Sequence, residues 1–377
     1  MNRYLDARIR KDLQKKMVLL TGPRQVGKTT LSQQLVSELE GSQYLNFDVA
    51  AHRAVIQAQR WRQSAPLLVL DEIHKMRDWK TWLKGVFDGR APGQQILVTG
   101  SARMDTFRQG GESMAGRYFR LRLHPLSVRE WSEQAQVNPH AALTRMLERG
   151  GFPEPALATS PTDAERWRTG YFSALVREDV LEFSRLQEVN AMRLFAEMLR
   201  SRVGSPLSLA SLARDLHIAP MTLTKYLDIL EALFIVFVVR PWHRNIARAT
   251  LQAPKVYFYD TGLVLGDDGI RFENLVACHL LKLQQWRQDT RGMAVDLHYV
   301  RTKDGAEVDF ALSAGDTLTD LVECKLGDVK PHSALARFAE QWPQAQAIQL
   351  VRECKAEADV VRLQVREAAP WLAALEV

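Results

Sequence analysis

An octapeptide near the start of the chain constrains the fold more than any other feature: Gly22-Pro23-Arg24-Gln25-Val26-Gly27-Lys28-Thr29. The apolar residues 17–20 lead directly into it, and residues 28–39 follow with apolar positions near helical spacing. A strand, a glycine-bearing loop and a helix in this order point backbone N–H groups at a phosphate. We therefore expect an ATP site at residues 22–30, ending at Thr30, in which Lys28 reaches the β- and γ-phosphates and Thr29 binds Mg²⁺.

Two acidic residues follow a second apolar run, residues 67–70, and form the pair Asp71-Glu72. In a nucleotide site, an aspartate at the end of a buried strand holds Mg²⁺ through its water shell. The following glutamate acts as general base on the attacking water. These are the roles that we predict for Asp71 and Glu72. The alternative is a solvated acidic pair at a strand terminus.

A third apolar run, residues 96–98, ends in Thr99-Gly100-Ser101. Ser101 is the candidate sensor of the γ-phosphate or the lytic water, although a simple strand-to-turn boundary would give the same pattern. Residues 44–47 and 118–123 add two more strand candidates. Five strands interleaved with helices predict an α/β fold with a doubly wound, mostly parallel sheet, whose site lies at the carboxyl ends of the strands.

The chain resembles the AAA-type predicted ATPases of bacteria and archaea that carry a C-terminal domain of uncharacterised function. The resemblance rests on the segments GPRQVGKTT, LLVLDEIHK, VTGSAR, AGRYFRLRLHPLSVREW and GGFPEP, in that order. It implies an AAA+ fold with a helical lid after the sheet, and residues 125–200 read mainly as helix. It also makes Arg117 a candidate arginine finger or sensor, in cis or across a subunit interface. The alternative for Arg117 is a surface arginine beside a strand.

A helix-turn-helix pattern follows in residues 209–233, with the turn at residues 217–220. The second helix carries Thr222, Thr224 and Lys225 near its N-terminal end, the part that meets bases or phosphates when such a unit docks in a DNA groove. Residues 234–239 and 256–259 read as the strands of a wing. We therefore predict a winged helix, and the resemblance extends through this stretch.

The segment between Ala232 and Tyr259 contains cations and no acidic residue. Its cations are Arg240, Arg244, Arg248 and Lys255. Such a segment suits contacts with DNA phosphates, and Arg240, Arg244 and Arg248 join the candidate DNA-binding residues. The alternative is a winged helix used for protein packing or as part of the ATPase lid.

The last third of the chain contains a predicted hairpin followed by a strand with acidic and basic residues. Residues 296–301 and 307–312 alternate around Asp304-Gly305, which predicts a hairpin. Asp309, Glu323 and Lys325 fall where two carboxylates and a lysine can converge, as a metal-dependent nuclease requires. This pattern resembles the PD-(D/E)xK nuclease motif, and Glu273, which we expect to open a helix, matches the acidic helix residue of that fold. The residue before Asp309 is Val308 where the motif has proline, and the carboxylates have neighbouring Arg301 or Lys303 as alternative partners.

Bulk properties set the remaining expectations. The 377 residues carry a formal charge of +6, and the longest apolar run, residues 232–239, is too short to span a membrane. With three cysteines and no apolar leader, we expect a cytoplasmic protein without disulfides. The expected domains are a P-loop AAA+ core (1–125), a helical lid (126–200), a winged helix (201–264) and a PD-(D/E)xK nuclease-like domain (265–377).

Three functions fit these features. The leading hypothesis is an ATP- and Mg²⁺-dependent AAA+ ATPase that processes duplex, branched or damaged DNA, with a homo-oligomer as a further expectation. The second is a regulatory switch in which ATP controls a protein-binding surface and the C-terminal domain is inactive. The third is an ATP-gated, metal-dependent endonuclease.

Overall fold

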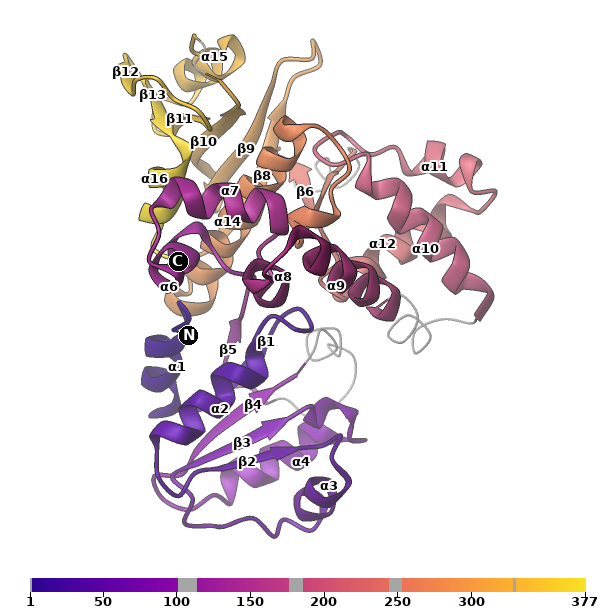
Figure 1. Cartoon of the computed structure of the whole chain (residues 1–377), viewed down its shortest axis with the longest axis vertical. Helices are drawn as coiled ribbons and strands as arrows, with labels where there is room; N and C mark the ends of the chain where they lie inside the picture. The colour runs from indigo at the N-terminus through magenta and orange to yellow at the C-terminus, as the bar shows by residue number, and fades with distance from the viewer. Residues whose placement is uncertain (1, 101–113, 176–185, 244–252, 328–329) are drawn as a thin grey trace. The chain divides into compact units, whose positions relative to one another are not determined.

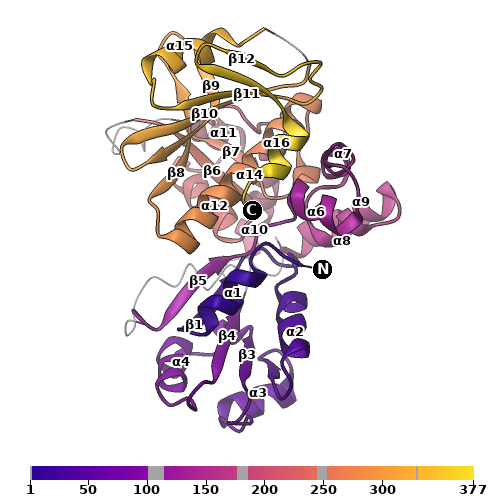
Figure 2. The same cartoon turned by 90° about the vertical axis from the view of Figure 1, so that its left-hand side faces the viewer.

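The computed structural model describes residues 2–100, 114–175, 186–243, 253–327 and 330–377. The chain forms two compact units, Met1–His124 and Pro125–Val377. Figures 1 and 2 show the elements of each unit from two sides. In the part of the chain that the structure describes, no helix is long and apolar enough to cross a membrane.

The first unit is built around a five-stranded sheet with the order β2-β3-β4-β1-β5, in which all neighbouring pairs are parallel. The strands are β1 (Met17–Thr21), β2 (Gln43–Asn46), β3 (Leu67–Asp71), β4 (Gln95–Thr99) and β5 (Tyr118–Arg122). The helices are α1 (Asp6–Leu13), α2 (Lys28–Glu38), α3 (Ala50–Gln57) and α4 (Trp79–Asp88). The predicted doubly wound parallel sheet is therefore confirmed.

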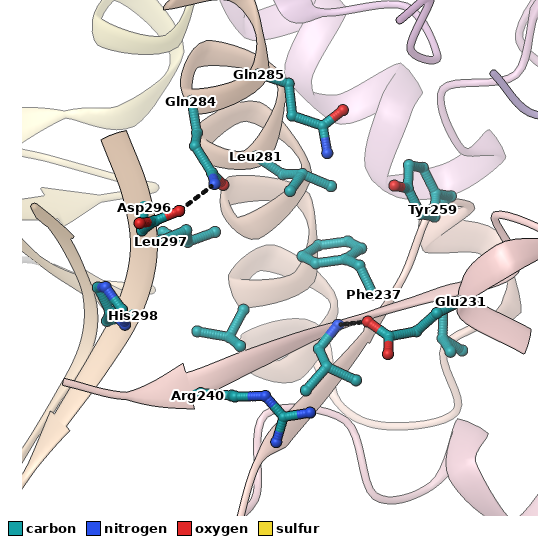
Figure 3. Close-up of a pocket in the computed structure, with 13 residues that line it drawn as sticks. Glu231, Phe237, Arg240, Tyr259, Leu281, Gln284, Gln285, Asp296, Leu297 and His298 are labelled. Atoms are coloured by element: carbon teal, nitrogen blue, oxygen red, sulfur yellow. Dashed lines mark hydrogen bonds between the residues drawn. The ribbon is translucent and has the colours of Figure 1, made fainter. Parts of the chain in front are cut away.

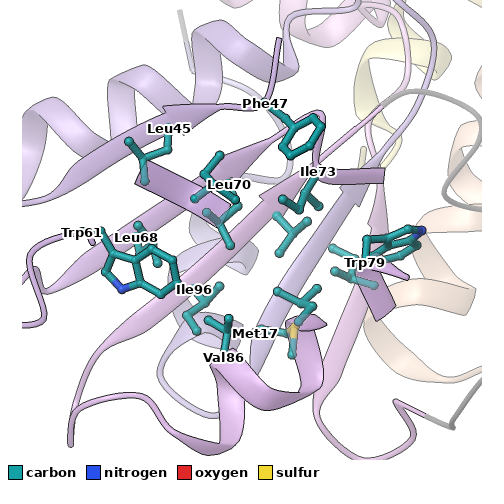
Figure 4. Packing of buried hydrophobic residues seen from close by; sticks show 14 of the residues in the cluster. Met17, Leu45, Phe47, Trp61, Leu68, Leu70, Ile73, Trp79, Val86 and Ile96 are labelled. Atoms are coloured by element: carbon teal, nitrogen blue, oxygen red, sulfur yellow. The ribbon is translucent and has the colours of Figure 1, made fainter. Parts of the chain in front are cut away.

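The central strands are buried on both faces, which is why they read as unbroken apolar runs. On one face, Met17 and Leu19 of β1 join Leu68 and Leu70 of β3 in a core that also contains Trp61 and Trp79 (Figure 4). The other face carries α1, which packs on β1 and β4, and α2, which packs on β2, β3 and β4. This packing fixes the carboxyl ends of β1, β3 and β4, where the polar residues of the site begin.

The second unit begins with helices. They are α6 (Val128–Ala135), α7 (Pro139–Arg149), α8 (Pro153–Leu157), α9 (Pro161–Ala174), α10 (Leu186–Arg200), α11 (Leu209–Asp215) and α12 (Pro220–Ala232). Strands β6 (Val236–Pro241) and β7 (Lys255–Phe258) follow and pair antiparallel. The order helix, turn, helix, hairpin is the one that the sequence predicts for this stretch.

The rest of the second unit extends this hairpin into an eight-stranded mixed sheet with the order β12-β13-β11-β10-β9-β8-β6-β7. Its further strands are β8 (Val295–Arg301), β9 (Glu307–Ala314), β10 (Thr317–Lys325), β11 (Gln346–Val351), β12 (Ala358–Val360) and β13 (Leu363–Glu367). Helix α14 (Asp268–Arg291) packs on β7, β8, β9 and β10, α15 (Ser333–Gln341) packs on β9, β10, β11 and β13, and α16 (Ala368–Ala374) packs on β13. Strand β6 is thus a member of the C-terminal sheet, so residues on both sides of the expected boundary at 264/265 share one sheet.

Buried polar contacts fix the helices that follow Pro125 to the C-terminal sheet domain. Lys282 of α14 donates to the Glu130 carboxylate, and both side chains are buried. Arg168 of α9 pairs with Asp260 at 3.0 Å, with both side chains at most 5% exposed. A Cβ at Gly150 would lie 1.9 Å from Asp260 Oδ1, so this turn admits only glycine. The segment predicted as the lid is therefore packed into the second unit.

Candidate functional site

Two glycines give the loop after β1 its shape. Gly27 has φ 101° and is the residue before α2, and Gly22 has φ 143°. A Cβ at Gly22 would lie 2.3 Å from the carbonyl oxygen of Leu123, so a larger residue cannot occupy this position. The loop therefore turns tightly from β1 into the N-terminal end of α2, where backbone N–H groups are free of intrahelical partners.

Lys28 folds back into this loop. Its Nζ donates to the carbonyl oxygens of Gly22 at 2.9 Å and Pro23 at 2.6 Å, and the side chain is buried. Burial lowers the pKa of Lys28 to about 8, and the nearby Glu72 and Asp71 offset part of this effect. A cation of this kind favours an anion in the loop, because a phosphate would replace carbonyl dipoles with full negative charge.

The carboxylate of Asp71, at the end of β3, is the centre of a polar cluster. The Thr29 hydroxyl donates to its Oδ2 at 3.1 Å, and Asn46 Nδ2 donates to the same oxygen at 3.3 Å. The hydroxyls of Tyr44 and Thr99 also donate to Asp71, and burial raises the pKa of Tyr44. Asp71 is thus held by groups from α2, β2 and β4.

The residues at this cluster fit Mg²⁺. A threonine hydroxyl and an aspartate carboxylate lie beside each other next to a phosphate-binding loop, and hard oxygen ligands of this type are those that Mg²⁺ prefers. Thr29 and Asp71 are the residues that would hold the ion. Bound there with a nucleotide, Mg²⁺ would neutralise charge on the phosphates.

Glu72 lies immediately beyond β3 in the left-handed region, with φ 56°. Its backbone N–H donates to the Thr99 carbonyl at 2.9 Å, which anchors it to β4. Its Oε2 lies 3.6 Å from His74 Nε2 and 3.7 Å from Lys75 Nζ. Burial and the neighbouring Asp71 raise the pKa of Glu72. An anchored carboxyl of raised pKa beside the loop suits a general base.

Sequence reasoning missed several residues of this site. Arg3, in the N-terminal segment, donates from Nη1 to the Val26 carbonyl at 2.7 Å and from Nη2 to the His124 carbonyl at 2.5 Å, which braces the loop. Tyr44 and Asn46 were also missed, and Thr99 was noted at its strand end, but Ser101 was chosen in its place. For Thr99, the polar ending of an apolar strand was the available signal.

Two predicted catalytic residues do not complete the site. Ser101 lies outside the described residues. Arg117 lies just before β5, where its carbonyl accepts from the Met17 N–H at the start of β1, and its guanidinium pairs with Asp88 at 2.9 and 3.0 Å. The loop begins at the other end of β1, about 15 Å away along the strand. The role of Arg117 in cis is therefore wrong, and the role in trans stays a prediction.

The candidate DNA-binding residues are split between a helix and a strand. On α12, Thr224 and Lys225 are exposed and Thr222 is half-buried. Arg240 lies half-buried on β6, and Arg244 and Arg248 lie outside the described residues. Lys255, the fourth cation of the segment that we expected to suit DNA phosphates, is not available for such a contact. Its side chain is 1% exposed and lies among carboxylates.

Arg240 instead borders a pocket of about 340 Å³ between β6, β8 and α14 (Figure 3). Strands β6 and β8 pair at Arg240 and Pro241, and the pocket opens beside the earlier part of β6. Glu231, at its edge, accepts from the Val238 N–H at 3.1 Å, and burial raises the pKa of Glu231 to about 7. The pocket mixes carboxyl, imidazole and amide groups with apolar walls.

The four predicted nuclease residues lie in one cluster, in which Glu323 is buried and the other three are partly buried. The Asp309 N–H donates to Glu323 Oε2 at 3.3 Å, the Cys324 N–H donates to Asp309 Oδ2 at 2.8 Å, and Lys325 Nζ donates to Glu323 Oε1 at 2.7 Å. Glu273 joins them from α14, which begins at Asp268 and so places Glu273 inside the helix, not at its opening. Burial, together with Asp309, raises the pKa of Glu273 and of Glu323 to about 7.

These residues do not fit a divalent ion. Two lysines and the Tyr257 hydroxyl, which donates to Glu273 Oε1 at 2.7 Å, already face the carboxylates. Among the described residues, no group of three or more histidine, cysteine or acidic side chains is arranged to hold a metal. We therefore derive no metal-dependent reaction from this cluster.

Three family models match successive parts of the chain. Residues 14–132 match the family described as "AAA domain", and the chain carries this domain. Residues 140–270 and 268–370 match two families that are each described as a domain of unknown function, DUF8612 and DUF4143.

Similar proteins include uncharacterised proteins of Mycobacterium tuberculosis and Mycobacterium bovis. Each is 34% identical over 263 residues, which are 68% of this chain and 57% of the relative. The chain thus spans little more than half of these relatives. A protein of Haemophilus influenzae is 24% identical over 334 residues, with 80% of each chain covered. Among solved structures, a RuvB variant of Thermotoga maritima (18% identical, 62% of this chain and 88% of that one) has a TM-score of 0.32. AMPPCP-bound DnaA of Aquifex aeolicus is 14% identical, with 60% of this chain and 86% of that one covered, and has a TM-score of 0.33.

Proposed function

We propose that this chain, whose residues 14–132 form an AAA domain, hydrolyses ATP with Mg²⁺ and uses the nucleotide cycle to control how its C-terminal unit engages DNA. The observation that carries the ATPase part is the convergence on Asp71. Thr29 from the loop helix and Thr99 from β4 both donate to this carboxylate. Lys28 directly precedes Thr29 in the sequence, and Glu72 directly follows Asp71.

Each residue has a distinct task in this proposal. The loop N–H groups and Lys28 bind the phosphates, with Lys28 leaving the carbonyls of Gly22 and Pro23 to do so. Glu72 takes a proton from the attacking water, a task that its raised pKa favours. Thr99 fixes the orientation of Asp71. Mg²⁺, held by Thr29 and Asp71, would supply charge neutralisation on the phosphates.

The DNA part of the proposal rests on α12. Thr224 and Lys225 are exposed in its N-terminal half, and Pro220 occupies its first turn. A lysine and a threonine hydroxyl at that end of the second helix of a helix-turn-helix are suited to phosphate and base contacts. The formal charge of +6 is compatible with such a partner.

The test is the ATPase rate with and without duplex, single-stranded and branched DNA, for wild type, Glu72→Gln and Lys225→Ala. We expect at least one DNA structure to stimulate hydrolysis by wild type, with a steep dependence on salt. Lys225→Ala should weaken this stimulation, whereas Lys303→Ala, an exposed lysine in the β8–β9 turn, should not. Equal rates with and without every DNA would refute the DNA part while leaving the ATPase intact.

One observation favours a second function, an ATP-controlled protein-binding switch. Met221, beside Thr222 at the start of α12, is 74% exposed, and methionine is common at protein-binding surfaces. A Met221→Asp variant separates the two functions. It should abolish a protein contact made through α12, while a DNA contact made through Lys225 should lose far less.

A further inference from the structure

Lys255 is the most enclosed cation of the C-terminal cluster. It lies at the start of β7, its side chain is 1% exposed, and its Nζ is 2.6 Å from Glu307 Oε1. The same atom is 3.6 Å from Glu273 Oε1 and 4.0 Å from Asp309 Oδ1. The Tyr299 ring, 5.3 Å from the ammonium, adds a cation–π contact.

These contacts join three separate elements through one ammonium group. Glu273 comes from α14, whereas Glu307 and Asp309 come from β9. Because carboxylate charge that is withdrawn from water is disfavoured unless it is paired, a neighbouring cation stabilises the ionised form of these groups. In a metal-dependent nuclease, the divalent ion supplies that positive charge. In this cluster, the ammonium group of Lys255 supplies the positive charge.

The second lysine of the cluster serves the remaining carboxylate. Lys325 Nζ donates to Glu323 Oε1, and His332 Nδ1 lies 3.3 Å from the same oxygen. The second oxygen of Glu323 accepts from the Asp309 N–H, and Oδ2 of Asp309 accepts from the Cys324 N–H. Asp309 and Glu323, the two carboxylates that a PD-(D/E)xK site would offer to an ion, are therefore engaged by protein groups.

We propose that Lys255 is a built-in cation that takes the place of a divalent ion, so that this cluster is a metal-free joint between β7, α14 and β9 and not a cleavage site. The proposal is independent of the function of the AAA domain. It removes the endonuclease hypothesis and assigns Lys255 a structural role in joining the β6–β7 hairpin to the C-terminal sheet domain.

The test uses the full chain without nucleotide, in a Thr29→Ala background that weakens ion binding at the AAA site. We expect no bound Mn²⁺ by electron paramagnetic resonance and no change of Tm with millimolar Mn²⁺. Adding Lys255→Met should lower Tm by roughly 10 °C, because three carboxylates lose their cation. Mn²⁺ should then restore part of that loss. The control is Lys325→Met, whose lysine is 31% exposed, and we expect a smaller drop without Mn²⁺ recovery.

Two results would overturn the proposal. One is that the protein with Lys255 intact binds Mn²⁺ or nicks DNA in the presence of Mg²⁺, and that Asp309→Asn abolishes this binding or nicking. The other is a folded Lys255→Met variant that Mn²⁺ does not stabilise. If Lys255→Met does not fold, the double variant Lys255→Met with Glu307→Gln removes the ammonium with its nearest carboxylate, and we expect it to fold and to gain Tm with Mn²⁺. Absence of that gain would equally refute the proposal.

Discussion

The hydroxyl of Thr29 donates a hydrogen bond to Asp71 at 3.1 Å, which joins the first turn of α2 to the end of β3 across 42 positions of sequence. The two motifs of the AAA domain are thus in direct contact. Substitutions in these two motifs affect one site, and they can distinguish residues needed for nucleotide binding from residues needed for hydrolysis.

Glu72→Gln should retain ATP binding and lose hydrolysis. The amide keeps the shape of the side chain but cannot accept the proton of the attacking water, so we expect kcat to fall by a factor of about 10² to 10⁴. Lys28→Ala should instead lose affinity for ATP. Steady-state hydrolysis and equilibrium binding of a fluorescent ATP analogue measure the two effects. Unchanged turnover in Glu72→Gln would exclude Glu72 as the base.

Thr99→Val should slow ATP hydrolysis. The substitution is close to isosteric and removes the hydroxyl that orients Asp71. A hydrogen bond to a charged group contributes about 1.5–3 kcal/mol, so kcat should fall roughly tenfold or more. Thr169→Val, at an exposed helical threonine whose hydroxyl donates to the Glu165 carbonyl, is the matched control and should be silent. A Thr99→Val enzyme with wild-type kcat would show that this contact has no part in turnover.

ATP binding above pH 8 should be coupled to proton uptake. In the free protein, burial lowers the pKa of Lys28 to about 8, and bound phosphates would raise it again because they favour the ammonium. Affinity should consequently fall as pH rises from 8 to 9. Calorimetry at pH 8.5 in two buffers of different ionisation enthalpy measures the uptake, and Lys28→Arg should abolish it. Identical heats in both buffers for wild type would contradict the assignment.

Acidification should destabilise the second unit through His279. Its Nε2 accepts from the Val128 N–H at 2.9 Å, its Nδ1 bonds the Leu275 carbonyl at 2.8 Å, and burial lowers its pKa to about 4. The folded pKa lies below the unfolded value of about 6.5, so this stability is complete above pH 6.5 and falls as pH drops towards 4.

Between pH 7.5 and pH 5, the free energy of unfolding should lose about 2 kcal/mol from this group. Urea denaturation of wild type and His279→Gln at both pH values isolates the effect, because glutamine does not titrate. The two proteins would show the same pH dependence if His279 made no contribution.

Arg168→Met should destabilise the second unit by about 3–5 kcal/mol, because it leaves the Asp260 carboxylate buried without its ion pair. Arg129→Met is the control. Arg129 and Glu133 form an exposed pair on α6, and its loss should cost less than about 1 kcal/mol. Denaturant midpoints give both values, and equal effects of the two substitutions would argue against a stabilising role for the buried pair.

The N-terminal sheet and its loop were predictable because each depends on a local pattern. The octapeptide fixes its own strand, loop and helix, and Asp71-Glu72 follows a short apolar run that is typical of a buried strand. Tyr44 and Asn46 were not predictable as site residues. They reach Asp71 only because β2 lies beside β3, and nothing in their own surroundings indicates that neighbour.

Lys255 shows why the C-terminal unit was harder to interpret. A lysine among basic neighbours reads as a surface cation, but β7 is buried along its length, and the carboxylates that accompany Lys255 come from residues 18, 52 and 54 positions later. The hairpin around Gly305 and the pairing of Asp309 with Glu323 were predicted, because alternation and turn chemistry are local. The helical segment after Pro125 was predicted as helix, but its packing on α14 depends on residues some 150 positions away.

The shared sheet also bears on how such chains can be assembled in evolution. The two families of unknown function that match this chain meet at residues 268–270, inside the first turn of α14, and the β6–β7 hairpin of the first lies in the sheet of the second. Recombination at that border would split a helix and leave an open strand edge on each fragment, which invites aggregation. We expect the two segments to be inherited together, and gene fusions to join them to other domains near residue 125 instead.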